Sequence, residues 1–77
     1  MITVAKTLEI QNIEFLDNQT MMVKLSNDRT FLIPLDKFPA IKNLNTKERL
    51  DFEIIDGANL SFLSIDEIYS LDELIGL

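Results

Sequence analysis

The sequence of 77 residues contains no cysteine and no histidine. Without cysteine the chain can form neither disulfides nor thiolate metal sites, and without histidine it lacks the most common general base and metal ligand. The remaining nucleophiles and proton carriers are Ser, Thr, Tyr, Lys and carboxylates. The composition therefore predicts a protein that is not an enzyme and that uses no metal ion or cofactor.

Glycine and long apolar runs are also scarce. The two glycines, Gly57 and Gly76, lie in a predicted turn and near the carboxyl end, so no glycine-rich loop is present to hold a nucleotide phosphate. No stretch reaches the roughly 18 apolar residues of a membrane span, and the first residues do not resemble a secretion signal. We expect a cytoplasmic protein that has no membrane segment and no evident small-molecule substrate.

Basic residues are absent from the last third of the chain. All seven Lys and Arg lie between Lys6 and Arg49, so residues 1–50 carry 7 − 6 = +1 and residues 51–77 carry −7. A negative field repels phosphate backbones, which disfavours direct binding of nucleic acid. The acidic residues either form a solvated face that keeps the protein soluble or attract a basic protein partner.

The length of the chain predicts one domain over residues 1–77 with a single core, in which residues 1–9 are an amino-terminal extension or an extra strand. Hydrophobic residues make up 47% of the sequence, which is rich for a domain with so much surface. Part of that apolar surface is expected to lie in an interface, either with a partner or in a homodimer.

Alternating apolar and polar residues predict antiparallel strands. The segment 8–16 alternates and then slips by one residue at Asn12-Ile13, which predicts a strand with a bulge or a break. Four further segments show strand patterns, and turn-prone residues separate them. These predicted strands are 20–25, 30–35, 52–55 and 60–62.

Two short helices are predicted after the third strand. Asp36 is a candidate N-cap for a helix from Lys37, and Asn45 or Thr46 is a candidate N-cap for a helix through Leu50. The side chains of Lys47, Glu48 and Arg49 in the second helix are expected to face solvent.

The carboxyl end contains a near-duplicate of six residues. Residues 64–69 and 70–75 each begin with a Ser-x-x-Glu capping box, and the second copy has the apolar spacing of a helix that starts after Ser70. The predicted fold is therefore α+β, with a four- to five-stranded antiparallel sheet, two short helices after the third strand and a C-terminal helix.

Several short motifs occur along the chain, namely the turn Leu25 to Arg29, Pro34-Leu35, Phe38-Pro39, the short helix Thr46 to Arg49, and the tail positions Phe62, Asp66, Glu67, Ser70 and Leu74. Together they resemble the motifs of a small bacterial family catalogued as domain of unknown function 2442. The resemblance covers about residues 13–76, although Phe62 replaces the usual Trp, and Ile68 and Tyr69 stand where Asp and Ile are usual.

The resemblance implies a protein-interaction module. Members of the family are often encoded beside a second small protein in arrangements that look like toxin and antitoxin pairs, so the chain is expected to be an antitoxin-like binder that uses its acidic tail. The candidate partner-binding residues are Asp66, Glu67, Tyr69, Asp72 and Glu73. For Tyr69 two placements stay open, the rim of the core or an interface anchor.

Three alternatives remain from the sequence alone. The first is a phage-type acidic inhibitor that imitates nucleic acid, and the second is a homodimeric scaffold. The third is a hydrolase or a hard-cation site in which Asp66-Glu67 meets Asp72-Glu73 across a turn.

Overall fold

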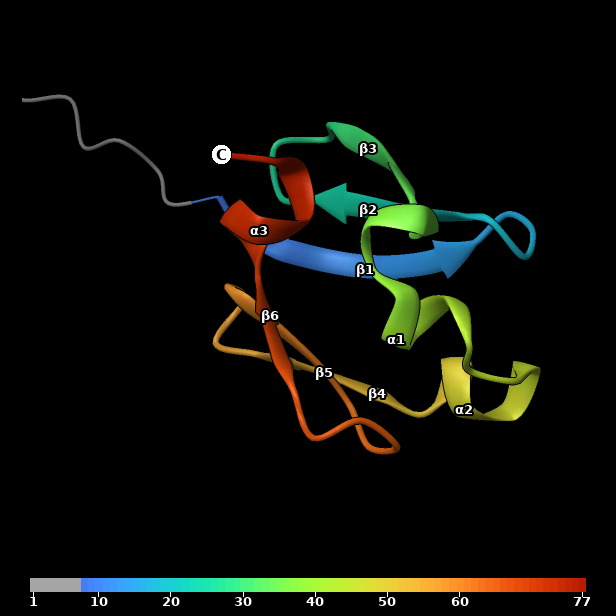
Figure 1. Cartoon of the computed structure of the whole chain (residues 1–77). Helices are drawn as coiled ribbons and strands as arrows, with labels where there is room; N and C mark the ends of the chain where they lie inside the picture. Colours follow the sequence, from blue (N-terminus) through green and yellow to red (C-terminus); the bar gives the residue numbers. More distant parts are fainter. Residues whose placement is uncertain (1–7) are drawn as a thin grey trace, which may run out of the picture.

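The computed structural model describes residues 8–77 and begins with a three-stranded antiparallel sheet (Figure 1). Strands β1 (Ile10–Phe15), β2 (Thr20–Leu25) and β3 (Thr30–Pro34) follow one another in space as in sequence. The register of β1 against β2 shifts between Ile10 and Asn12, so the predicted irregularity near Asn12 is confirmed. The prediction for residues 1–9 lies mostly outside the described residues, and Leu8 and Glu9 precede β1 without joining a strand.

Short helices connect this sheet to the rest of the chain. They are a 3₁₀ turn, η1 (Leu35–Lys37), followed by α1 (Pro39–Lys42) and α2 (Thr46–Leu50). The predicted helix from Lys37 is wrong in its placement, because α1 begins at Pro39 and no side chain caps it. Asp36 instead accepts a hydrogen bond from Lys42. At α2, Asn45 and Glu48 form a capping box, which satisfies two backbone amides that the helix start leaves without partners.

A second three-stranded antiparallel sheet follows. It consists of β4 (Phe52–Ile55), β5 (Asn59–Phe62) and β6 (Ile68–Ser70), and the chain continues directly into α3 (Leu71–Ile75). Ser70 and Glu73 form the predicted capping box of α3, and Gly76 ends the helix at φ 83°. The first copy of the duplicate forms no helix: residues 64–67 make the turn that leads into β6.

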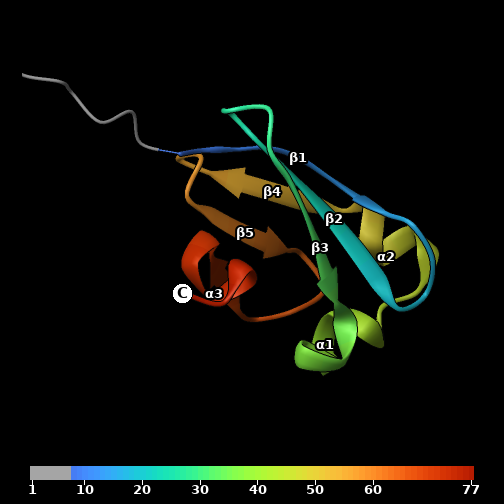
Figure 2. The ribbon, with the colours of Figure 1, turned by 90° about the horizontal axis from the view of Figure 1, so that it is seen from above.

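The single four- to five-stranded sheet of the prediction is therefore wrong. The two sheets lie on opposite sides of one core, and β1 runs beside β4 at their edges (Figures 1 and 2). The Ile10 amide donates to the Gly57 carbonyl over 2.6 Å at one end of this seam. Helices of four or five residues cannot cover a whole sheet face, so in a chain of this length a second sheet buries the apolar side of the first.

The core fills the space between the sheets. Phe62 is fully buried, and its ring centroid lies 6.2 Å from those of Phe15 and Phe52. Phe38 packs edge-on against Tyr69 at the other side of the core. Every helix in residues 8–77 falls far short of the length needed to cross a bilayer.

Candidate functional site

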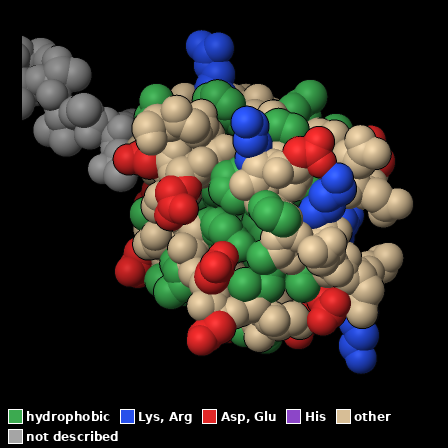
Figure 3. All heavy atoms as spheres, in the orientation of Figure 1, with side chains coloured by type: hydrophobic (Ala, Val, Ile, Leu, Met, Phe, Trp, Pro, Cys, Tyr) green, Lys and Arg blue, Asp and Glu red, His purple; other side chains and the backbone are tan. Residues whose placement is uncertain are grey.

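The charge difference between the two parts of the sequence coincides with the two sheets. All residues of β4, β5, β6 and α3 lie in the segment 51–77, which carries seven carboxylates and no cation. Figure 3 shows the resulting surface. Its lower left, over α3 and the second sheet, displays carboxylates and apolar side chains but no Lys or Arg. The seven acidic residues of segment 51–77 therefore belong to the part of the molecule that the second sheet and α3 form.

The outer face of the second sheet, which points away from the core, combines acidic and apolar side chains. Strand register places Glu53, Ser61 and Ile68 in one row across the three strands. Alternation places Asp51 and Leu63 on the same face, and the Leu63 amide donates to the Asp51 carbonyl over 3.0 Å. Leu63 and Ile68 are 60% and 59% exposed, so two large apolar side chains lie in water beside two carboxylates.

The turn between β5 and β6 adds two of the predicted site residues to this surface. Asp66 and Glu67 are exposed and immediately precede Ile68. The one ion pair in residues 8–77 joins Lys42 to Asp36, far from this turn in sequence, so no cation within the described chain neutralises Asp66 or Glu67. We call the outer face of the second sheet together with residues 63–67 the acidic face.

The other predicted carboxylates lie elsewhere. Asp72 and Glu73 belong to the first turn of α3, at the opposite end of β6 from Asp66 and Glu67 (Figure 1). Three strand residues separate the two pairs by about 10 Å. Glu73 already accepts hydrogen bonds from the amide and hydroxyl of Ser70. The structure therefore does not bring the two acidic pairs together, and no group of three or more potential ligand side chains occurs in the described segment.

Tyr69 is a buried residue, 6% exposed, on the inner side of β6. Its hydroxyl donates a hydrogen bond to Oε2 of Glu67 over 2.8 Å. Burial, this hydrogen bond and the negative charges of Glu67 and Glu73 together raise the pKa of Tyr69 to about 12. The buried ring thus packs on the inner side of the second sheet, and its hydroxyl orients the Glu67 carboxylate.

Tyr69 should make the fold sensitive to strong alkali. Because its folded-state pKa is raised above the ordinary value of 10, its contribution to stability is complete below pH 10 and is lost as the pH rises through about 12. Tyr69 is the only tyrosine, so phenolate absorbance should report its titration directly. We expect Glu67→Gln to lower this pKa, and an unchanged titration would contradict the assigned hydrogen bond.

A groove of about 460 Å³ is lined by residues of β1, α2 and β4. Phe15 and Phe52 are its aromatic lining, and Arg49 of α2 borders it. Contrary to the prediction that its side chain faces solvent, Arg49 is only 7% exposed. The full lining is Ile13, Glu14, Phe15, Asp17, Asn18, Thr46, Arg49, Leu50 and Phe52.

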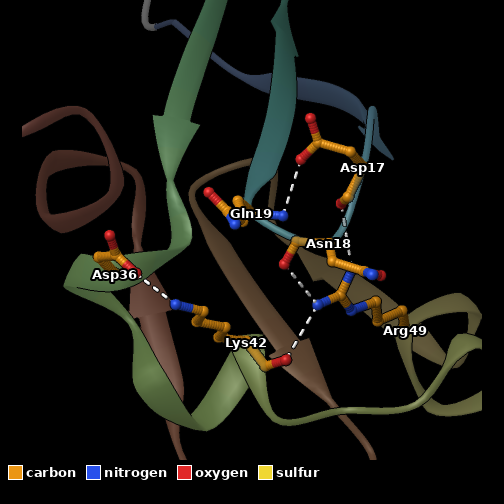
Figure 4. Close-up of polar contacts among 6 residues, drawn as sticks. All are labelled: Asp17, Asn18, Gln19, Asp36, Lys42 and Arg49. Carbon is orange, nitrogen blue, oxygen red and sulfur yellow. Dashed lines mark hydrogen bonds and ion pairs between the residues drawn. The ribbon is translucent and has the colours of Figure 1, made fainter.

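The Arg49 guanidinium holds three segments together (Figure 4). It donates to the carbonyls of Asp17, Asn18 and Lys42 over 3.2, 3.1 and 2.9 Å, and it lies 4.8 Å from the centroid of the Phe15 ring. Its Nε atom has no hydrogen-bond partner within residues 8–77. Because its terminal nitrogens donate three hydrogen bonds to backbone carbonyls of other segments, Arg49 acts as a structural clamp.

Sequence reasoning missed most of the acidic face. It selected carboxylates by their clustering along the chain, whereas Asp51 and Glu53 join Leu63 and Ile68 through strand pairing. The signal was present in the predicted hairpin 52–62, because alternate residues of paired strands share a face.

The fold and its acidic face define a small domain of two packed antiparallel sheets. Residues 10–77 match the family described as protein of unknown function (DUF2442), and the chain belongs to that family. The resemblance inferred from the sequence motifs is thereby confirmed. No curated protein and no solved structure matches the chain.

Proposed function

We propose that this protein is a noncatalytic protein-interaction module of the cytoplasm that binds a basic protein through its acidic face. The observation that carries the proposal is the juxtaposition of exposed apolar residues, Leu63 and Ile68, with exposed carboxylates that no cation of the described chain neutralises. Interfaces commonly combine an apolar centre that supplies affinity with a charged surround. Charges of one sign also accelerate association with an oppositely charged partner.

The chemistry of the expected partner follows from the face. It should present Lys or Arg side chains around an apolar contact, so that ammonium or guanidinium groups reach Asp66, Glu67 and Glu53 while an apolar side chain covers Ile68. The genomic arrangement implied by the family resemblance supports an antitoxin-like role, in which the partner is encoded next to this chain. An acidic inhibitor of a nucleic-acid-binding protein is the narrower alternative.

Affinity capture with matched variants tests the proposal. The full chain is used at low ionic strength to capture proteins from its own organism, and retention of each captured protein is compared with that on Asp66→Asn/Glu67→Gln and on Ile68→Ser. We expect either change to weaken retention of a basic partner about tenfold, which corresponds to about 1.4 kcal/mol.

The control removes the same charge from the other sheet. Glu14→Gln/Asp28→Asn also neutralises two exposed carboxylates and should leave retention unchanged. Equal loss with both double variants would mean that only net charge matters, and unchanged retention with the acidic-face variants would reject this binding surface. Displacement of the partner by duplex DNA would identify the inhibitor alternative.

A further inference from the structure

Strand β3 forms an open edge of the first sheet. Hydrogen bonds from the Leu25 amide to the Arg29 carbonyl and from the Leu35 amide to the Gln19 carbonyl, each 2.8 Å, flank its pairing with β2. Alternation along an antiparallel ladder then directs the backbone groups of Phe31 and Ile33 toward β2. The backbone groups of Thr30, Leu32 and Pro34 point the other way, where the described chain provides no further strand.

This edge is apolar and uncharged. The strand reads Thr-Phe-Leu-Ile-Pro, with Phe31 38% and Leu32 62% exposed. Helix α3 lies beside the edge on the side of the second sheet (Figures 1 and 2), and a groove of about 210 Å³ separates the helix from β3. Natural edge strands are usually protected by charges, proline or a covering element. Here Pro34 ends the strand and Lys37 and Glu73 line the groove beside it, but β3 itself carries no charged residue.

The other sheet edges are less suited to pairing. Strand β6 has three residues and follows the acidic pair Asp66-Glu67. Strands β1 and β4 border each other along the seam that the bond from Ile10 to Gly57 closes at one end. Among the described strands, β3 therefore combines adequate length, an absence of charge and open backbone groups.

We propose that two copies of this chain associate by antiparallel pairing of β3 with β3, centred on Leu32. In this register the two Leu32 residues exchange two hydrogen bonds across the two-fold axis. Each Thr30 amide donates to the Pro34 carbonyl of the other copy. Pro34 has no amide hydrogen, so the facing Thr30 carbonyl stays in water at the margin of the contact.

Charge and side-chain pairing favour a second copy as the occupant. Strand β3 places no charge opposite itself, and residues 1–50 carry only +1, whereas contact between two acidic faces would oppose like charges. Leu32 lies opposite Met22 of β2 on the outer side of the sheet. Self-pairing joins the two Met22-Leu32 pairs into one apolar row across the axis, and it leaves both acidic faces free for partners.

Sedimentation of the full chain over a range of concentrations tests this proposal. We expect a monomer and dimer equilibrium in which Leu32→Lys raises the dimer dissociation constant at least about tenfold, because two like charges would meet at the axis. Leu16→Lys is the matched control, because Leu16 is a leucine of similar exposure that lies in the turn after β1, away from the β3 edge. It should leave the equilibrium unchanged.

Hydrogen exchange provides a second readout that needs no variant. The Leu32 amide should become protected as the concentration of the wild-type chain rises, while the Phe31 and Ile33 amides are protected throughout. A chain that is monomeric at every concentration, a dimer that tolerates Leu32→Lys, or a dimer with an unprotected Leu32 amide would each overturn the proposal.

Discussion

Replacing Arg49 by methionine should lower the free energy of unfolding by about 2–4 kcal/mol. Methionine retains much of the apolar stem but donates no hydrogen bond, so the carbonyls of Asp17, Asn18 and Lys42 lose the guanidinium that links them. The turn between β1 and β2 would then be held to α1 and α2 by weaker contacts. Urea or thermal unfolding monitored by circular dichroism measures the change.

Two variants separate the clamp from simple charge. Arg49→Lys keeps the positive charge but offers one nitrogen in place of the two that contact the three carbonyls, so it should also destabilise, by less than methionine. Lys47→Met removes a charge from an exposed position of the same helix and should change stability by less than about 0.5 kcal/mol. Equal stability of the Arg49→Met variant and the wild type would reject the clamp.

Replacing Phe62 by alanine should cost about 3–5 kcal/mol of stability. The side chain is fully buried, and its ring contacts Phe15 of the first sheet and Phe52 of the second. A domain of this size has a total stability of roughly 4–12 kcal/mol, so the loss is a large part of the whole. Phe62→Leu, which retains most of the volume, should cost clearly less. A small effect for alanine would show that the sheets do not depend on this contact.

The elements that sequence reasoning found are those whose signals are local. Alternation located the strands of the first sheet and the hairpin 52–62, and the Ser70 capping box with Gly76 located α3. Pairing between distant segments has no such signal. Strand β6 has three residues, too few for a period to show, and the choice between one sheet and two depends on how the core is covered.

Arg49 illustrates the same limit at the level of one side chain. An arginine among polar neighbours in a short helix normally faces water, and nothing in residues 46–50 indicates that carbonyls from the turn after β1 will surround it. The candidate site likewise contains residues that the sequence indicates and residues that only strand pairing reveals. The sequence identified Asp66 and Glu67, but the contribution of Asp51 and Glu53 depends on the register of β4 against β5.

The two proposed surfaces use the charge division of the molecule differently. The near-neutral sheet offers an uncharged edge for a second copy, and the acidic sheet offers a face for a basic partner. Because the surfaces lie on different sheets, a dimer would present two acidic faces and could bind two partner molecules. Loss of dimerisation through Leu32→Lys should therefore leave the affinity of a single acidic face unchanged.

The proposed function is tested most directly by NMR. This protein is isotope-labelled, the captured basic partner is added without label, and the amide chemical shifts that change are assigned to residues. We predict that the largest amide perturbations fall on Glu53, Ser61, Ile68 and the turn containing Asp66 and Glu67, and that they diminish as salt is added. Perturbations confined to the first sheet, with the amides of β4 to β6 unmoved by a bound partner, would contradict it.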